Sequence, residues 1–310
     1  MNPSKTKHGL RAPILIPFLL CLAALSSPSR LRGDPGIEET IAAAGKGDPQ
    51  AEFALGEAYD NGKGVPRDPV KAVEYYRKAA EQGHPQAQND LGVMYAQGEG
   101  VKRDDAEAVK WFRKAAAQGY AKAQASLGWM LSNGNGTPKD AKEALEWYQK
   151  AAAQNLLSAE INLAQIYYFG SDGQERNYPE AARWARKAAA QGSPWAQNTL
   201  GAMSELGLGM ATDVKQAAVW FSAAAAQGDA KGEGNLGRLY ATGSGVERDP
   251  VAAFQWLTLG AQGGDGIAAE QLVRLQKTLT PEQLAEGNRR VEAFKQSRKS
   301  AANPQATPQH

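Results

Sequence analysis

The chain has 310 residues, a length that suits either two ordinary domains or one long repeat array. Its formal net charge is +2, and 22% of its residues are charged. This near-neutral balance excludes the strongly basic surface that a nucleic-acid-binding protein needs. The 33 glycines and 16 prolines favour short helices separated by turns.

The first 26 residues have the order of an export signal. Lys5, Lys7 and Arg11 precede an uncharged apolar run over residues 12–25, and small residues follow that run. We therefore expect residues 1–26 to be removed and the protein to be periplasmic or secreted. The alternative is an uncleaved membrane anchor, although the apolar run is short for a membrane span.

Removal of this segment changes the charge of the chain. The segment holds three of the 35 basic residues and no acid, so the mature chain has 32 basic and 33 acidic residues. We therefore expect neither nucleic-acid binding nor membrane insertion of the mature chain. The single cysteine, Cys21, also lies in the segment, which excludes disulfides and cysteine-based metal sites from the mature chain.

His84 is the one histidine in the body of the chain, since His8 lies in the expected signal and His310 is the last residue. It stands between Gly83 and Pro85 and has no acidic or nucleophilic partner nearby in the sequence. We interpret it as a turn residue rather than a general base. The composition thus predicts no catalytic residue, no metal and no cofactor.

A six-fold repeat with a period of 36 or 37 residues runs through the rest of the chain. A leucine followed by glycine or alanine marks each copy, at Leu55, Leu91, Leu127, Leu163, Leu200 and Leu236. An aromatic column keeps the same phase, at Tyr75, Trp111, Trp147, Trp184, Trp220 and Trp256, as does a capping column at Asp68, Asp104, Asp140, Asn177, Asp213 and Asp249. The longer step comes from one extra residue in the turn at residues 170–173. A fixed period in this range is typical of an α-solenoid.

Each repeat is predicted to form two helices. In the first copy, Asp48-Pro49 suits the start of a helix and the Gly-x-Gly turn at residues 62–64 ends it. Asp68-Pro69 begins the second helix, which ends at Gly83. We therefore interpret the Asp column as helix caps rather than metal ligands, and the glycine turns as turns rather than phosphate loops. The aromatic column is predicted to form the core between the helices, and the glycine after the marker leucine to sit at a close helix approach.

Residues 87–119 resemble the Sel-one-like repeat family, which is related to the tetratricopeptide repeats. The family pattern A-x-x-x-L-G-x-x-Y-x-x-G-x-G-V-x-x-D-x-x-x-A-x-x-W-[YF]-x-x-A-A-x-Q-G is almost literal there. The resemblance implies an all-α, right-handed α-solenoid with six repeats over residues 48–263. We expect an N-terminal cap over residues 27–47, capping helices over 264–296, the last opened by the capping box Thr280–Gln283, and a disordered tail over 297–310.

The resemblance also implies which side chains face a partner, because the first helices of tetratricopeptide-like repeats line a concave groove. In the middle repeats, the groove positions hold Trp129, Ile161, Gln165, Tyr168, Phe169, Trp195, Asn198 and Glu205, whereas the outer repeats place Glu57, Asp60, Lys122 and Arg238 there. Aromatic side chains are favoured anchors of interfaces. We predict a partner-binding patch centred on Trp129, Tyr168, Phe169 and Trp195. The alternative, that these rings pack against neighbouring repeats, stays open at this stage.

The leading interpretation of function is a monomeric, non-catalytic exported scaffold that binds a protein or an extended peptide. One alternative is a β-lactamase-like or penicillin-binding protein, because a secreted cysteine-rich branch of the resembled family has been described in those terms. The mature chain lacks the cysteine pairs of that branch and a Ser-x-x-Lys motif. The other alternative is a structural spacer of the cell envelope.

Overall fold

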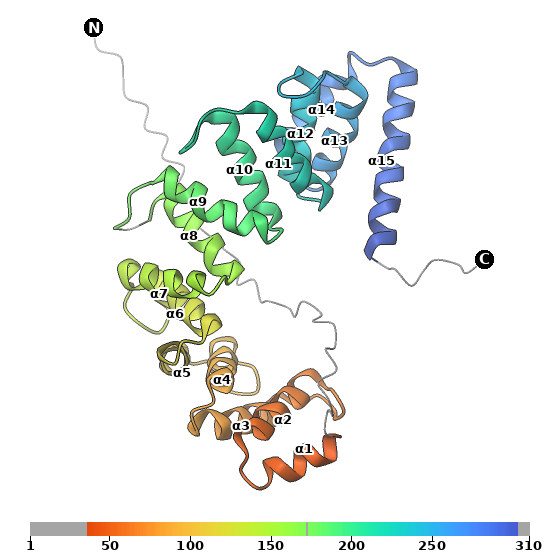
Figure 1. Ribbon diagram of the computed structural model, residues 1–310. Helices are drawn as coiled ribbons and strands as arrows, with labels where there is room; N and C mark the ends of the chain where they lie inside the picture. The colour runs from red at the N-terminus through yellow and green to blue at the C-terminus, as the bar shows by residue number, and fades with distance from the viewer. Residues whose placement is uncertain (1–35, 172, 303–310) are drawn as a thin grey trace, which may run out of the picture.

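The computed structural model describes residues 36–171 and 173–302, and these ranges form helices joined by short turns (Figure 1). The helices are α1 (Ile37–Ala44), α2 (Pro49–Asn61), α3 (Pro69–Glu81), α4 (Pro85–Gln97), α5 (Asp105–Ala117), α6 (Ala121–Asn133), α7 (Ala141–Ala153), α8 (Leu157–Phe169), α9 (Tyr178–Ala190), α10 (Pro194–Leu206), α11 (Val214–Ala226), α12 (Ala230–Thr242), α13 (Pro250–Gln262), α14 (Gly266–Gln276) and α15 (Pro281–Ala302). The expected signal, residues 1–26, lies outside the described residues. Within the described part of the chain, no helix combines the length and apolar character needed to cross a membrane.

The helices stack into an array of six pairs, from α2 with α3 to α12 with α13, and α1, α14 and α15 cover the two ends. Each helix packs chiefly against its neighbours in sequence. Figure 1 shows the pairs arranged in an arc whose ends, α1 and α15, lie on the same side. The expected all-α solenoid of six repeats is thus confirmed.

The second helix of every repeat begins at a side-chain cap. Asp68, Asp104, Asp140, Asn177, Asp213 and Asp249 each accept a hydrogen bond from a backbone N–H two or three residues further on. Such a bond satisfies one of the free donors of the first helical turn. The interpretation of this column as helix caps is confirmed.

The second glycine of the Gly-x-Gly turn lets the turn pack closely against the preceding repeat. Gly100 has a φ of +67°, and a Cβ on it would lie 2.1 Å from the carbonyl oxygen of Pro69, at the start of α3. Gly136, Gly209 and Gly245 approach the second helix of the preceding repeat in the same way. Gly173, in the lengthened turn, has nothing within 4 Å of the corresponding point. In the fourth repeat, which has the extra residue, this close contact between the turn and the preceding repeat is therefore absent.

The glycine after the marker leucine makes room for a large side chain of the following helix. A Cβ on Gly92 would lie 2.7 Å from the ring of Phe112, and Gly56, Gly128, Gly201 and Gly237 face Tyr76, Tyr148, Phe221 and Leu257 in the same way. The fourth repeat has Ala164 instead of glycine, and the residue at the facing position is Ala185. Glycine is thus matched by a large side chain and alanine by a small one, as close packing requires.

The substitution Gly92→Ala tests this match. The added methyl group overlaps Phe112, which is fully buried, so neither side chain has space into which to move. We expect the free energy of unfolding to fall by about 1–2 kcal/mol, within the range for overpacked cores. Urea denaturation measures this change. The matched control is the same Gly92→Ala change made in a Phe112→Ala background, where the ring that the methyl group meets is absent; an equal loss in both backgrounds would contradict the steric explanation.

The aromatic column is only partly a core column, which corrects the sequence-based prediction. Trp111 and Trp184 are buried, but Tyr75, Trp147, Trp220 and Trp256 are half-buried. The residue that follows each column member is buried throughout: Tyr76, Phe112, Tyr148, Ala185, Phe221 and Leu257. One residue turns a helix by about 100°, so the following residue faces the first helix of its own repeat. The column members lie at the edge of that core. In four of the six repeats, the lysine three residues after the column member lies over its aromatic ring.

The last helix is longer than predicted. The capping box is confirmed, because the Thr280 hydroxyl accepts from the Gln283 N–H and the Gln283 side chain accepts from the Thr280 N–H. However, α15 continues to Ala302, so the expectation that it ends near residue 296 and that disorder begins at 297 is wrong for residues 297–302. Contacts with the array explain the extension: Phe294 packs edge-on against Trp256 with 4.9 Å between ring centroids, and Arg298 pairs with Glu233.

Candidate functional site

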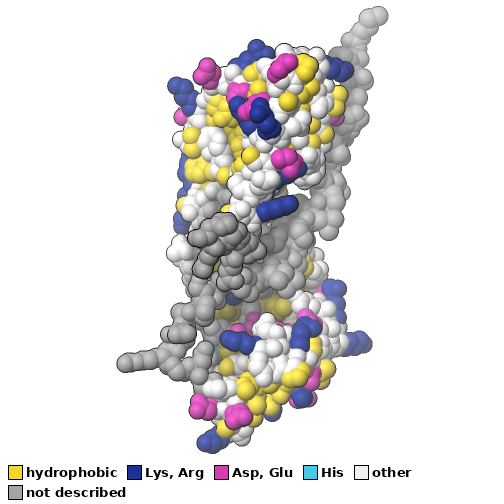
Figure 2. Space-filling model, turned by 90° about the vertical axis from the view of Figure 1, so that its right-hand side faces the viewer, with side chains coloured by type: hydrophobic (Ala, Val, Ile, Leu, Met, Phe, Trp, Pro, Cys, Tyr) yellow, Lys and Arg dark blue, Asp and Glu magenta, His cyan; other side chains and the backbone are white. Residues whose placement is uncertain are grey.

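The first helices of the repeats lie on the inner side of the arc. In Figure 1, α2 and α4 lie on the inner side of α3 and α5, and consecutive first helices approach each other directly at α10 with α12. We define the inner face as the solvent-facing side chains of α2, α4, α6, α8, α10 and α12. Figure 2 looks toward the open side of the arc and shows apolar side chains interspersed with charged ones at both of its ends.

The middle of the inner face carries large apolar side chains that remain partly accessible. Trp129 on α6, Ile161 on α8 and Trp195 on α10 are half-buried, with one part of each packed against the core. Gln165 on α8 is half-buried as well, and its Oε1 has no hydrogen-bond partner within the described residues. These side chains therefore take part in packing and also face solvent.

The predicted aromatic patch is not one cluster of touching rings. Tyr168 lies edge-on to Phe169 at 4.9 Å between centroids and edge-on to Tyr178, the first residue of α9, at 5.6 Å. Among the described residues, no ring contact joins Trp129 or Trp195 to this group. The sequence analysis did not single out Tyr178, although its position directly after the Asn177 cap would have placed it beside the end of α8.

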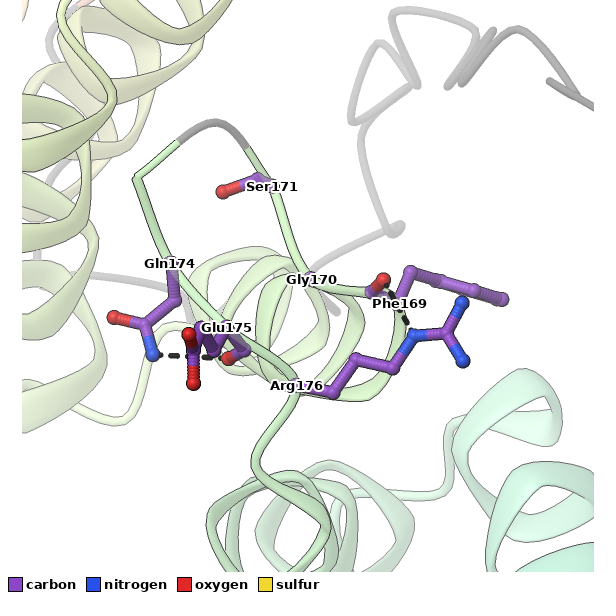
Figure 3. A pocket seen from close by; sticks show the side chains of 6 residues that line it. All are labelled: Phe169, Gly170, Ser171, Gln174, Glu175 and Arg176. Atoms are coloured by element: carbon purple, nitrogen blue, oxygen red, sulfur yellow. Dashed lines mark hydrogen bonds between the residues drawn. The ribbon is translucent and has the colours of Figure 1, made fainter.

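Phe169 is the most accessible member of the patch, with 52% of its surface exposed. It borders a shallow, open pocket together with Gly170, Ser171, Gln174, Glu175 and Arg176 (Figure 3). The Nε of Arg176 donates a hydrogen bond of 3.1 Å to the Phe169 carbonyl oxygen. Figure 3 shows the Phe169 and Arg176 side chains on one side of the turn and Gln174 on the other, so the polar groups do not converge on a common point. This arrangement offers a surface contact rather than a reaction centre.

At the C-terminal end of the inner face, the polar groups pair with one another. Arg238 on α12 makes two hydrogen bonds to the Glu205 carboxylate on α10, of 2.8 and 2.6 Å. The Asn235 amide donates to the Asn198 Oδ1 at 2.9 Å. Two of the predicted partner-binding residues, Asn198 and Glu205, therefore serve contacts between repeats.

At the N-terminal end, three carboxylates lie close together: Glu57 and Asp60 on α2 and Asp90 on α4. Burial raises the pKa of Asp90 to about 6, the hydrogen bond from Asn89 and the charge of Lys122 oppose this rise, and the Asp60 charge adds a smaller upward effect. Burial and the Asp90 charge raise the pKa of Glu57, and burial and Glu99 raise that of Asp60. A cluster of this kind holds negative charge at an energetic cost.

His84 has a structural role, as the sequence indicated. Its Nδ1 accepts the Ala87 N–H at 3.2 Å and thereby caps α4, and its ring stacks on Phe53 with 4.7 Å between centroids. Burial lowers its pKa, which keeps the ring neutral and able to accept. In the described ranges, no group of three His, Cys, Asp or Glu side chains is arranged to hold a metal ion.

A series of side-chain hydrogen bonds, each from an exposed glutamine to a buried glutamine or glutamate, joins neighbouring helices and was not predicted from the sequence. The glutamine at the end of each second helix donates to a buried side chain of the preceding first helix: Gln82 to Glu52, Gln118 to Gln88, Gln154 to Gln124, Gln191 to Glu160 and Gln227 to Gln197. The glutamines recur with the period of the repeat, so the signal was present. In the last repeat Gly263 replaces the glutamine, and Arg298 of α15 binds the buried Glu233 instead.

Comparison with known proteins agrees with this architecture. A family model described as the Sel1 repeat matches residues 49–84, 85–120, 121–156, 157–193, 196–229 and 230–265. No curated protein matches the chain.

Solved structures include similar proteins. A Sel1 repeat protein from Oxalobacter formigenes is 33% identical with a TM-score of 0.63, and the match covers 73% of this chain and 99% of that one. A protective antigen of uropathogenic Escherichia coli with an SLR fold is 29% identical with a TM-score of 0.42, over 88% of this chain and 75% of that one. Six successive matches span most of the array described above, and the chain therefore belongs to the Sel1 repeat family.

Proposed function

We propose that the protein is an exported, non-catalytic scaffold whose inner face binds an extended polypeptide. Sel1 repeats form a scaffold family that typically mediates protein interactions. The observation that carries the proposal is the row of half-buried apolar side chains at the middle of the inner face: Trp129, Ile161 and Trp195. Each comes from a different repeat, so the row runs across the helices rather than along one of them.

This arrangement suits a bound peptide for two physical reasons. Because each of these side chains is held in part by the core, little side-chain entropy is lost when a partner binds. Large aromatic groups in such positions commonly provide a major share of binding energy. Partners of repeat arrays bind along the stack because consecutive repeats present equivalent positions at regular spacing.

Paired substitutions separate binding from folding. Trp195→Ala should weaken partner binding by about 2 kcal/mol or more, close to thirty-fold, and should lower the melting temperature less than a core truncation does, because Trp195 is only partly packed against the core. Phe221→Ala removes a fully buried ring and should lower the melting temperature strongly. Trp220, the neighbour of Phe221, is a weaker core control than the sequence suggested, because it is half-buried. The readouts are peptide-binding affinity and thermal denaturation.

Equal losses of melting temperature in Trp195→Ala and Phe221→Ala would assign Trp195 to the core. The binding role of Trp195 would then be abandoned.

Export is proposed from the order of basic, apolar and small residues in the first 26 positions. We expect cleavage near residues 26–29. Intact-mass measurement on protein isolated from its host tests this expectation, and a soluble cytosolic product with the full-length mass would contradict it.

A further inference from the structure

We propose that the N-terminal end of the inner face, formed by Glu57, Asp60 and Asp90, receives a lysine or arginine side chain of the bound polypeptide. This inference rests on the proposed function and adds the chemistry of the partner. The occupant is an extended segment in which a basic residue precedes or follows an apolar one at a set spacing.

The repeat symmetry shows that the basic residue that pairs with Glu205 from the next repeat has no counterpart at Asp60. Glu205 stands five residues after the marker leucine of its repeat, and its partner Arg238 stands two residues after the marker leucine of the next. In the first and second repeats, the equivalent positions hold Asp60 and Val93. The position that holds the neutralising arginine at the C-terminal end thus holds an apolar residue at the N-terminal end.

Other basic side chains nearby do not replace that partner. Arg67 comes within 3.9 Å of one Asp60 oxygen, but its guanidinium is bonded to Glu99 and to the backbone carbonyl of Asp60. Among the described residues, no basic side chain lies within ion-pair distance of Glu57 or Asp90. Lys122 acts on both carboxylates only from a longer range.

A second observation points to the same place. Asn89 is 4% exposed, and its Nδ2 donates 2.8 Å to the Asp90 Oδ1, so its carboxamide lies against the carboxylate. Its own Oδ1 has no hydrogen-bond partner within the described residues. The half-buried Tyr120 lies near the same carboxylates, whose charges add to burial in raising its pKa; an aromatic side chain in this position favours an organic cation.

The continuity of the surface selects a peptide. The first helix of the third repeat, α6, carries both Lys122 at the edge of the acidic end and Trp129 in the apolar row. Packed helices are about 8–10 Å apart, and an extended chain covers about 3.3 Å per residue. A basic side chain at the acidic end therefore lies about three to six residues from an apolar side chain on the row.

A random dodecamer peptide library displayed against the chain, purified as its host makes it, tests the inference. We expect selected peptides to carry Lys or Arg three to six residues from an aromatic or large aliphatic residue.

In fluorescence anisotropy, replacing that basic residue with glutamine should weaken binding about tenfold or more. The triple variant Glu57→Gln/Asp60→Asn/Asp90→Asn should weaken the basic peptide similarly and leave the glutamine peptide unchanged. The exposed Glu146→Gln on α7 is the control and should affect neither peptide.

The variant Val93→Arg adds a test that removes no acid. It places an arginine where Arg238 stands in the last repeat, so the protein should neutralise its own Asp60 and bind the basic peptide about tenfold more weakly. Val93→Gln is the matched uncharged control and should retain binding. Loss of binding in Val93→Gln equal to that in Val93→Arg would assign the effect to bulk and overturn the role of charge.

The other outcomes are also decisive. Peptides that bind the inner face with no preference for basic residues would overturn this inference and leave the proposed function standing. Failure to select any peptide would overturn both. If Arg30→Gln/Arg32→Gln in the chain itself tightens peptide binding tenfold, the chain's own N-terminal segment is the occupant, and the proposal of an outside partner is wrong.

Discussion

Leu127→Ala should lower the free energy of unfolding by about 2–5 kcal/mol, the range for a leucine truncated in a close-packed core. Leu127 is fully buried in the third repeat and belongs to a hydrophobic cluster that runs from Phe53 to Met203. The array has no single centre, and each repeat is held by its two neighbours. A cavity in a middle repeat therefore weakens the interfaces on both of its sides.

Urea denaturation of Leu127→Ala and of the exposed Lys142→Ala measures this effect. The surface variant should stay within about 0.5 kcal/mol of the parent. A loss below that level for Leu127→Ala would mean that the marker leucines are not the core of the array. The structural interpretation of the repeat would then be wrong.

Arg298→Ala should destabilise the C-terminal end of the array by about 2–3 kcal/mol at neutral pH, because a buried carboxylate loses its charged partner. The Glu233 side chain is 3% exposed, and the Arg298 NH1 lies 2.8 Å from its Oε1. Burial raises the pKa of Glu233, and Arg298 opposes that rise. Without Arg298, folding must bury the Glu233 carboxylate without a charged partner, and the free-energy cost of doing so increases as the pH rises through the pKa of Glu233. The difference between parent and variant should therefore shrink in acid, where Glu233 is protonated.

A second substitution separates this explanation from a simple loss of helix contacts. Gln88, Gln124 and Gln197 occupy the position of Glu233 in other repeats, and each donates to a carbonyl eight residues earlier. Arg298→Ala/Glu233→Gln should thus recover most of the lost stability. No recovery would show that Arg298 acts through packing and not through the Glu233 charge.

The period of the sequence predicted the fold well, because the features that repeat are those that the backbone needs. The Asp column caps helices, and the Gly-x-Gly turns permit a positive φ and a close approach. The core position was predicted one residue too early. The column that includes Tyr75 and Trp111 is aromatic in every repeat, whereas the position after it varies. That following position holds tyrosine, phenylalanine, alanine or leucine according to the size of the residue it faces, and only the structure shows the facing partner.

The candidate site was less predictable, because the inner face is where the repeats differ. Sequence reasoning placed Trp129 and Trp195 on the first helices, but it did not predict that Glu205 pairs with Arg238. It named Glu57 and Asp60 but not Asp90, which stands outside the positions assigned from the resemblance. The Arg298–Glu233 contact lay in a segment interpreted as a disordered tail, since its composition is polar and carries no helical apolar period.

The measurement that tests the central claim most directly is NMR chemical-shift mapping of a selected peptide on the chain. If the inner face is the binding surface, the largest shifts will fall on α2, α4, α6, α8 and α10, and Trp129 and Trp195 will move together with the amides around Asp90. Shifts confined to the second helices α3, α5, α7, α9 and α11 would place the partner on the opposite face and contradict the account.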